Sequence, residues 1–80
     1  MQKTVLITGG NKGIGLAVTR LFLERGDRVV VVARDFSSFP YHGQAEEIAF
    51  DLARVEEIPQ LVKSIGGVDV LINNAGIMYS

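Results

Sequence analysis

The sequence contains no cysteine, no excess of charge of either sign and no long apolar run. Without cysteine the chain forms no disulfide, holds no cysteine-ligated zinc and offers no thiol nucleophile. Eight lysine and arginine residues stand against nine aspartate and glutamate residues, which argues against the basic surface that nucleic acids and anionic membranes attract. We therefore expect no nucleic-acid partner and no membrane partner, and the lack of cysteine fits a cytoplasmic location.

The apolar segments are too short for a membrane span or a secretory signal. No run reaches the roughly 18–20 residues of a spanning helix, and the first apolar stretch, Val5–Ile7, is far shorter than a signal core. Hydrophobic residues nevertheless make up 48% of the chain and charged residues 21%, a balance typical of globular proteins. A chain of 80 residues is one domain at most, and it buries only about 60–65% of its unfolded surface.

Four short segments rich in β-branched and apolar residues predict β-strands. They cover residues 3–8, 28–33, 46–50 and 68–72. The second segment contains four consecutive valines, which indicates a strand that is buried on both faces, as in a parallel sheet. The third segment is the weakest of the four.

Two segments with apolar residues at three- and four-residue spacing predict helices over 13–25 and 53–65. Gly26 and Gly66 follow them, at the positions where a left-handed cap is expected. Pro59 is tolerated if the second helix begins only two or three residues before it. In the first helix the spacing puts five apolar residues on one face: Ile14, Ala17, Val18, Leu21 and Phe22.

Turn-forming residues fill the segment 35–45, which predicts a loop with at most one helical turn. Elsewhere strands alternate with helices, and this order indicates parallel βαβ units with right-handed crossovers. We therefore predict an α/β fold in which helices cover a four-stranded parallel sheet.

A glycine-rich turn, Thr8-Gly-Gly-Asn-Lys-Gly-Ile-Gly15, joins the first strand to the first helix. Glycine permits a tight strand-to-helix turn, a close approach of backbone to phosphate and close packing of helix on strand. The helix N-terminus offers N–H groups and a positive dipole end to a pyrophosphate. The alternative is a turn that is rich in glycine for structural reasons alone. We predict a dinucleotide site whose first residues are Gly9, Asn11, Lys12, Gly13, Ile14 and Gly15.

This Thr-Gly-x-x-x-Gly-x-Gly spacing resembles the cofactor turn of the short-chain dehydrogenase/reductase family. The residues Gly-Gly-Asn-Lys-Gly-Ile-Gly within it especially resemble those of the carbonyl-reductase branch. The run Asn73-Asn74-Ala75-Gly76 is similar to the family's Asn-Asn-Ala-Gly motif, and Asp51-Leu52 resembles its adenine-contacting pair. The resemblance covers the whole chain. It implies a Rossmann-like three-layer parallel sheet, incomplete, with strand order 3-2-1-4. Residues 1–80 would be the N-terminal part of one dinucleotide-binding domain, with no second domain.

The resemblance also implies roles for the residues of these two later motifs. Asp51 would meet the adenine amino group, with the Leu52 backbone beside it, although Asp51 also suits a helix cap. Asn73 would tie the fourth strand to neighbouring backbone, or it is a plain turn residue. Three residues would lie along the nicotinamide-side ribose: Asn74, Ala75 and Gly76.

Arg34 ends the second predicted strand, at a position that faces the adenosine ribose in dinucleotide folds. An arginine there accommodates the 2′-phosphate of NADP, because a guanidinium presents paired donors to phosphate oxygens. Lys12 adds a second positive charge from the glycine turn. Asp35 is the competing residue, since a carboxylate would accept bonds from the ribose hydroxyls of NAD. We predict NADP as the cofactor, with NAD less favoured.

The catalytic residues that the resemblance implies are not in this sequence. Family members use a Tyr-x-x-x-Lys pair and a serine after the fourth strand, whereas Tyr41 is followed four residues on by Ala45 and Tyr79 is the penultimate residue. We predict the cofactor-binding portion of an oxidoreductase that moves hydride between nicotinamide C4 and a carbonyl or alcohol carbon, inactive as 80 residues. The alternatives are a non-catalytic NADP-binding module and a structural fragment.

The segment between the second and third strands departs from the family pattern, and the strand order has a consequence for the fourth strand. The family usually places a helix between its second and third strands, but residues 35–45 barely suffice for a parallel crossover of about a dozen residues, which leaves the register of the third strand open. In the order 3-2-1-4 the fourth strand lies at a sheet edge, and an edge strand invites pairing. We therefore predict self-association through residues 68–72, or a partner segment there.

Overall fold

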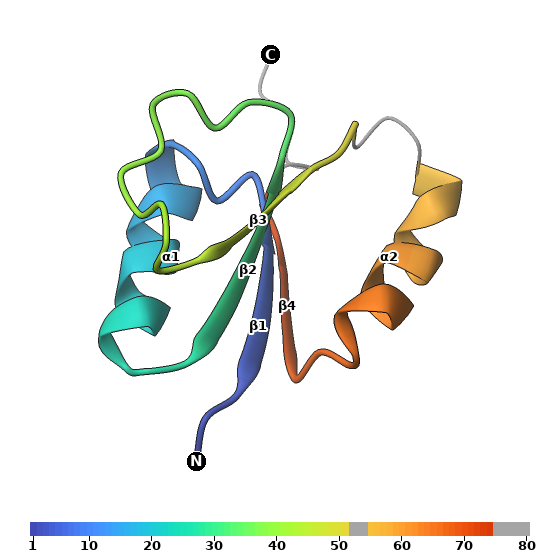
Figure 1. The fold of residues 1–80 in the computed structure, drawn as a ribbon, viewed down its shortest axis with the longest axis horizontal. Coiled ribbons are helices and arrows are strands. Elements are labelled where there is room, and N and C mark those ends of the chain that lie inside the picture. The colour runs from blue at the N-terminus through green and yellow to red at the C-terminus, as the bar shows by residue number, and fades with distance from the viewer. Residues whose placement is uncertain (52–54, 75–80) are drawn as a thin grey trace.

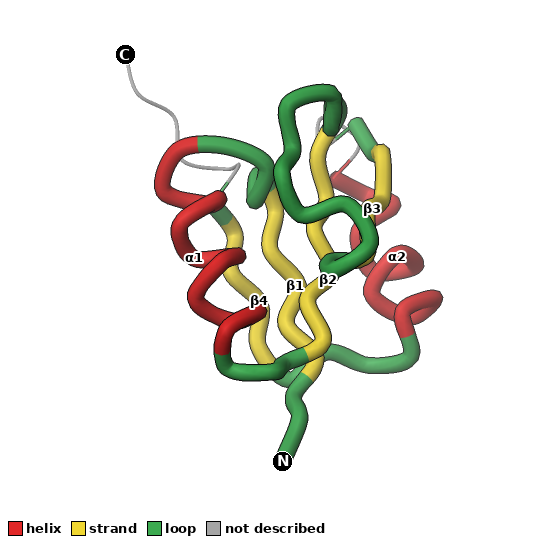
Figure 2. Tube along the Cα trace, turned by 60° about the vertical axis from the view of Figure 1, so that its left-hand side comes forward, coloured by secondary structure: helices red, strands yellow, loops and turns green. Residues whose placement is uncertain are grey.

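The computed structural model describes residues 1–51 and 55–74, which form a parallel sheet between two helical layers. Helix α1 (Gly13–Glu24) covers one face, and α2 (Ile58–Ile65), preceded by a 3-10 turn over Val55–Glu57, covers the other (Figures 1 and 2). The predicted fold class is confirmed. The sheet order is β3-β2-β1-β4, with strands β1 (Thr4–Thr8), β2 (Arg28–Ala33), β3 (Glu46–Ala49) and β4 (Val70–Asn73).

The boundaries of the elements lie close to the predicted ones, except at the start of α2. That helix begins at Ile58, not at residue 53, with Pro59 in its first turn. Proline is tolerated there because the first N–H groups of a helix have no intrahelical acceptor. Both helices are followed by glycines in the left-handed region, Gly26 at φ +83° and Gly66 at φ +92°. In the described residues no helix is long and apolar enough to cross a bilayer.

The valines of β2 form the centre of the core on both faces of the sheet. Val29 and Val31 pack on the α1 side, and Val30 and Val32 pack on the α2 side. All four are at most 1% exposed, so the prediction of a doubly buried strand is confirmed. Burial of one such side chain contributes about 1.5–3 kcal/mol, so β2 supplies a large share of the apolar burial in the sheet.

Helix α1 buries only part of the predicted apolar face. Val18 and Phe22 pack against the core, but Ile14 is 70% exposed and Leu21 is 54% exposed. The buried positions of the helix are Gly15 and Thr19. The five residues do share one side of the helix, as predicted, but only part of that side is buried. The small Gly15 side of the helix lies against the turn that precedes it, which rotates the rest of the apolar side toward solvent.

The crossover from β2 to β3 contains turns and no helix, and residues 34–45 are described in full. Phe39 lies in the core at 3% exposure. Its ring makes edge contacts with Phe36 at 5.4 Å and with Tyr41 at 5.7 Å between centroids. The aromatic cluster covers the sheet on the α1 side, and β3 still pairs in parallel with β2, which settles the open register.

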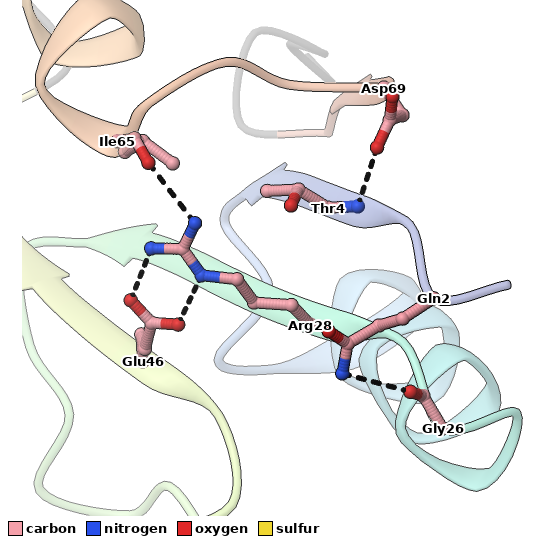
Figure 3. Close-up of polar contacts among 7 residues, drawn as sticks. All are labelled: Gln2, Thr4, Gly26, Arg28, Glu46, Ile65 and Asp69. Carbon is pink, nitrogen blue, oxygen red and sulfur yellow. Dashed lines mark hydrogen bonds and ion pairs between the residues drawn. The ribbon is translucent and has the colours of Figure 1, made fainter.

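Polar contacts join the elements at the end of the sheet where the strands begin (Figure 3). Arg28 donates to both carboxylate oxygens of Glu46, at 2.6 and 2.8 Å, and to the Ile65 carbonyl at 3.1 Å. The hydrogen bond and charge of Arg28 lower the pKa of Glu46. Asp69 accepts from the Thr4 backbone N–H at 2.8 Å, which ties β4 to β1. These contacts lie at the end of the sheet opposite to the candidate site, which is at the carboxyl ends of the strands.

Candidate functional site

A cavity of about 660 Å³ lies at the carboxyl ends of β1, β2 and β4. In parallel α/β sheets ligands bind at this end, where neighbouring crossovers diverge. Here β1 has β2 on one side and β4 on the other, so the turn after β1 lies at that point (Figure 1). The described residues that line the cavity are Gly9, Asn11, Lys12, Ala33, Arg34, Asp35 and Asn74.

The backbone of the glycine turn is held from three sides. The Gly9 N–H donates to the Val32 carbonyl at 2.8 Å, and Gly9 adopts φ +70°, which favours glycine. The Asn74 side-chain amide donates to the Gly9 carbonyl at 3.3 Å. Gly15 lies so close that a Cβ there would be 2.2 Å from the Gly9 oxygen. The turn is therefore a fixed element of the sheet end.

The start of α1 presents backbone donors beside this turn. Lys12 occupies the N-cap position in an extended conformation, with φ −159°, and within the described residues no side chain caps it. The first N–H groups of a helix have no intrahelical acceptor. They carry the positive end of the helix dipole, and together these features suit an anionic group.

A second set of contacts ties the glycine turn to the loop after β2. The Asn11 side-chain amide donates to the Asp35 backbone carbonyl at 2.7 Å. The Asp35 carboxylate accepts from the Ser37 N–H at 2.9 Å and from the Ser37 hydroxyl at 3.1 Å. These two bonds, and to a smaller extent the charge of Lys12, lower the pKa of Asp35. Asp35 is thus an ionised carboxylate with both oxygens engaged by Ser37.

Two cationic side chains, Lys12 and Arg34, line the same cavity from different elements. Lys12 comes from the glycine turn and Arg34 follows β2, and both are exposed. A smaller cavity of about 70 Å³ adjoins them and is lined by Asn11, Lys12, Asp35, Ser38 and Phe39. Positive charges and N–H groups that converge in this way match the acceptor oxygens of a phosphate.

The structure brings together five of the predicted site residues: Gly9, Asn11, Lys12, Arg34 and Asn74. Gly13 and Ile14 are exposed at the start of α1, whereas Gly15 is buried against the turn. Asp51 is exposed after β3 and is not among the described lining residues. Leu52, Ala75 and Gly76 lie outside the described residues. The contacts of all these residues with a cofactor stay predictions.

Two features of the site differ from the sequence-based expectations. The backbone contact implied for Asn73 is made by Asn74, while the Asn73 side chain accepts from the Thr8 hydroxyl at 2.9 Å. The sequence-based predictions do not include Ser37 as the hydrogen-bond partner of the Asp35 carboxylate. The Asp-x-Ser spacing signals it, because an aspartate often accepts bonds from the backbone and side chain two residues on.

The fold and this cavity define a nucleotide-binding protein of the Rossmann class. The family model described as short chain dehydrogenase matches residues 3–80. The chain therefore belongs to the short-chain dehydrogenase/reductase family.

Individual relatives are identical to this chain at about a third to two-fifths of the aligned positions. A short-chain dehydrogenase/reductase of Pestalotiopsis microspora is 40% identical over 82 residues, which cover 99% of this chain and 31% of that protein. A short chain dehydrogenase of Leptospira borgpetersenii, solved with bound NAD+, is 32% identical with a TM-score of 0.80, over 99% of this chain and 33% of that one.

The L-sorbose reductase of Gluconobacter frateurii, solved with NADPH and L-sorbose, is 33% identical with a TM-score of 0.77. The match covers 98% of this chain and 35% of that one. The chain thus spans about a third of the length of the relatives that it matches. Both nicotinamide dinucleotides occur among the solved relatives.

Proposed function

We propose that this chain is the N-terminal cofactor-binding portion of an NADP-dependent short-chain oxidoreductase. In the whole protein the cofactor would exchange a hydride with a carbonyl or alcohol carbon of a small molecule. The 80 residues alone would bind the dinucleotide without turnover, because the sequence has no Tyr-x-x-x-Lys pair. The cytoplasmic location stays a prediction.

The preference for NADP rests on the charges around the cavity. Arg34 and Lys12 line it together, and either cation would attract the additional 2′-phosphate. The carboxylate of Asp35, which would favour the ribose hydroxyls of NAD, has an oxygen engaged by the Ser37 N–H and the other by the Ser37 hydroxyl. Two exposed cations thus stand beside one carboxylate whose oxygens already accept bonds from Ser37, and this balance of charge supports NADP over NAD.

Other residues of the chain would hold the rest of the cofactor. The first N–H groups of α1, which have no intrahelical acceptor, would bind phosphate oxygens beside the glycine turn. Gly15 lies so close to Gly9 that no side chain fits between turn and helix. The contact between Asn11 and the Asp35 carbonyl keeps the two walls of the cavity at a fixed separation. The bound nicotinamide would supply the hydride chemistry.

Replacement of Arg34 by aspartate tests the cofactor proposal. We expect the Kd for NADPH to rise about 10–100-fold, because a charge-assisted bond worth about 1.5–3 kcal/mol is lost and repulsion is added. The Kd for NADH should stay within a few-fold. Calorimetric titration of the purified chain with each nucleotide at low salt measures both constants.

The charge-matched control is Lys63→Asp, because Lys63 lies in the last turn of α2, on the other face of the sheet. This variant should bind both nucleotides as the unmodified chain does. If the two variants lost NADPH affinity equally, Arg34 would contribute only the long-range attraction of a positive charge for the nucleotide, and no specific contact. Absence of heat with either nucleotide, from a chain shown to be folded, would contradict binding by these 80 residues.

The second candidate function, assembly through β4, is favoured by the exposure of that strand. Leu71 is 56% exposed, and β1 is the only partner of β4 in the described residues. The strand has no charged residue and no proline, the features by which edge strands usually resist pairing. We infer that two copies of the chain pair along β4.

Leu71→Lys places a charge on this exposed position and tests the pairing. We expect it to weaken the association of the chain about tenfold or more, because edge lysines oppose strand pairing. Sedimentation velocity across a concentration series gives the association constant. Lys63→Asp again serves as the control. A monodisperse monomer of the unmodified chain, with β4 amides protected from hydrogen exchange, would rule out the pairing.

A further inference from the structure

Thr19 is a polar residue in the fully buried part of α1. Its exposed fraction is 0%, although it lies in the middle of the helix, among residues that pack on the sheet. Its hydroxyl lies 2.9 Å from the Gly15 carbonyl and 3.1 Å from the Gly10 carbonyl. A hydroxyl carries one hydrogen, so the two carbonyls share it in a three-centre bond. The Gly15 branch is the ordinary contact of a helical threonine with the residue four positions earlier, and the Gly10 branch reaches outside the helix into the glycine turn.

The backbone of Gly10 rests directly on this side chain. A Cβ built on Gly10 would lie 2.6 Å from the Thr19 hydroxyl oxygen, and 3.0 and 3.1 Å from side-chain atoms of Val31 and Ile7. The turn therefore approaches the core most closely at Gly10. Thr19 supplies the polar group at this contact, and buried carbonyls need such a partner because water does not reach them.

The contact fixes the orientation of one peptide unit in the turn. In a planar trans peptide the C=O and the following N–H point in opposite directions, and none of the described peptide bonds is cis. Since the Gly10 carbonyl points toward Thr19, the Asn11 N–H points away from the core. Asn11 lines both cavities of the site.

We propose that Thr19 is a positioning residue for the nucleotide site: its hydroxyl holds the Gly10 carbonyl inward and thereby aims the Asn11 N–H at the ligand. The proposal rests on the proposed function, because it takes the cavity to be the nucleotide site. It adds a residue that lies beneath the turn and touches no ligand. Removal of the Thr19 hydroxyl lets the peptide unit between Gly10 and Asn11 rotate, and the Asn11 N–H then no longer points at the ligand.

Thr19→Val removes the hydroxyl and keeps the shape of the side chain, whereas Thr19→Ser keeps the hydroxyl. We expect Thr19→Val to raise the Kd for NADPH about tenfold, the factor that corresponds to one hydrogen bond. Thr19→Ser should stay within about twofold of the unmodified chain. The amide proton and nitrogen chemical shifts of Asn11, followed by NMR without nucleotide, should move in Thr19→Val and stay unchanged in Thr19→Ser.

A purely structural role of Thr19 would produce a different pattern. Ile65→Val, a core change on the α2 face, is the control for a general loss of stability. It should lower Tm without a change in the Kd or in the amide chemical shifts of Asn11. If Thr19→Val fails to fold, Thr19→Ala against Thr19→Ser makes the same comparison, since both lack the methyl group.

The outcomes separate the two proposals. Equal Kd values and equal Asn11 amide chemical shifts for the variants with and without the hydroxyl would overturn the role of Thr19. An unmodified chain that is folded but binds neither NADPH nor NADH would overturn the proposed function, and the chemical-shift comparison would still decide whether Thr19 orients the Gly10 peptide.

Discussion

Replacement of Phe39 by alanine is expected to remove a large part of the stability of this chain. A buried phenylalanine truncated to alanine costs about 3–5 kcal/mol, and a domain of this size has roughly 4–12 kcal/mol in total. Phe39 is 3% exposed and contacts the rings of Phe36, Tyr41 and His42. We expect Tm, followed by circular dichroism, to fall by about 15 °C or more.

The large effect follows from the position of Phe39 in the crossover. No helix covers this part of the sheet between β2 and β3, and the Phe39 ring belongs to the cluster that includes Val29 and Val31. Phe36→Ala is the matched control because Phe36 is only half-buried, and its loss of stability should be clearly smaller. Equal losses in the two variants would show that the loop is held by something other than the buried Phe39 ring.

The second large effect is expected for Gly15→Ala. In the interior of a helix alanine is ordinarily more favourable than glycine by about 1 kcal/mol. Here the new Cβ would lie 2.2 Å from the Gly9 carbonyl oxygen and 2.8 Å from the Asn74 amide nitrogen. We therefore expect the opposite sign, a loss of about 2–4 kcal/mol in the free energy of unfolding, measured by urea denaturation.

The same substitution should abolish measurable nucleotide binding, because the turn must move away from α1 to admit the methyl group. Gly43→Ala is the control. Gly43 has φ +84° and no neighbouring atom within 4 Å of its built Cβ, so its cost is backbone strain of about 1–2 kcal/mol. A Gly15→Ala chain that is as stable as the unmodified one would refute the close approach of helix and turn.

The order of elements was predictable from residues near one another in the chain, and the resemblance to a known family implied the strand order of the sheet. Four valines in sequence indicated burial on both faces of β2, and the helix-spaced apolar residues are followed by Gly26 and Gly66, which lie just after the two helices. The glycine turn and Arg34 follow parallel strands, so their placement at one end of the sheet followed from the topology alone. These features depend on local spacing and strand direction, which a single sequence contains.

The contacts that complete the site were not predictable in the same way. The rotation of α1 that buries Thr19 and exposes Ile14 depends on how closely Gly15 meets the turn, and apolar spacing does not record that distance. The loop over 35–45 was predicted and is confirmed, but the burial of Phe39 depends on whether its ring finds a place in the core. Both outcomes are decided by packing between segments that are distant in sequence.

The sequence by itself determined the fold class, the strand order and the family, and it located the cluster of phosphate-binding candidates around Gly9, Lys12 and Arg34. Only the tertiary structure decided that Ser37 engages both oxygens of Asp35 and that Thr19 lies under the glycine turn. The physical reason is that periodicity and turn residues specify local backbone geometry. The direction of a hydrogen bond is specified only when its donor and its acceptor have both been placed in space.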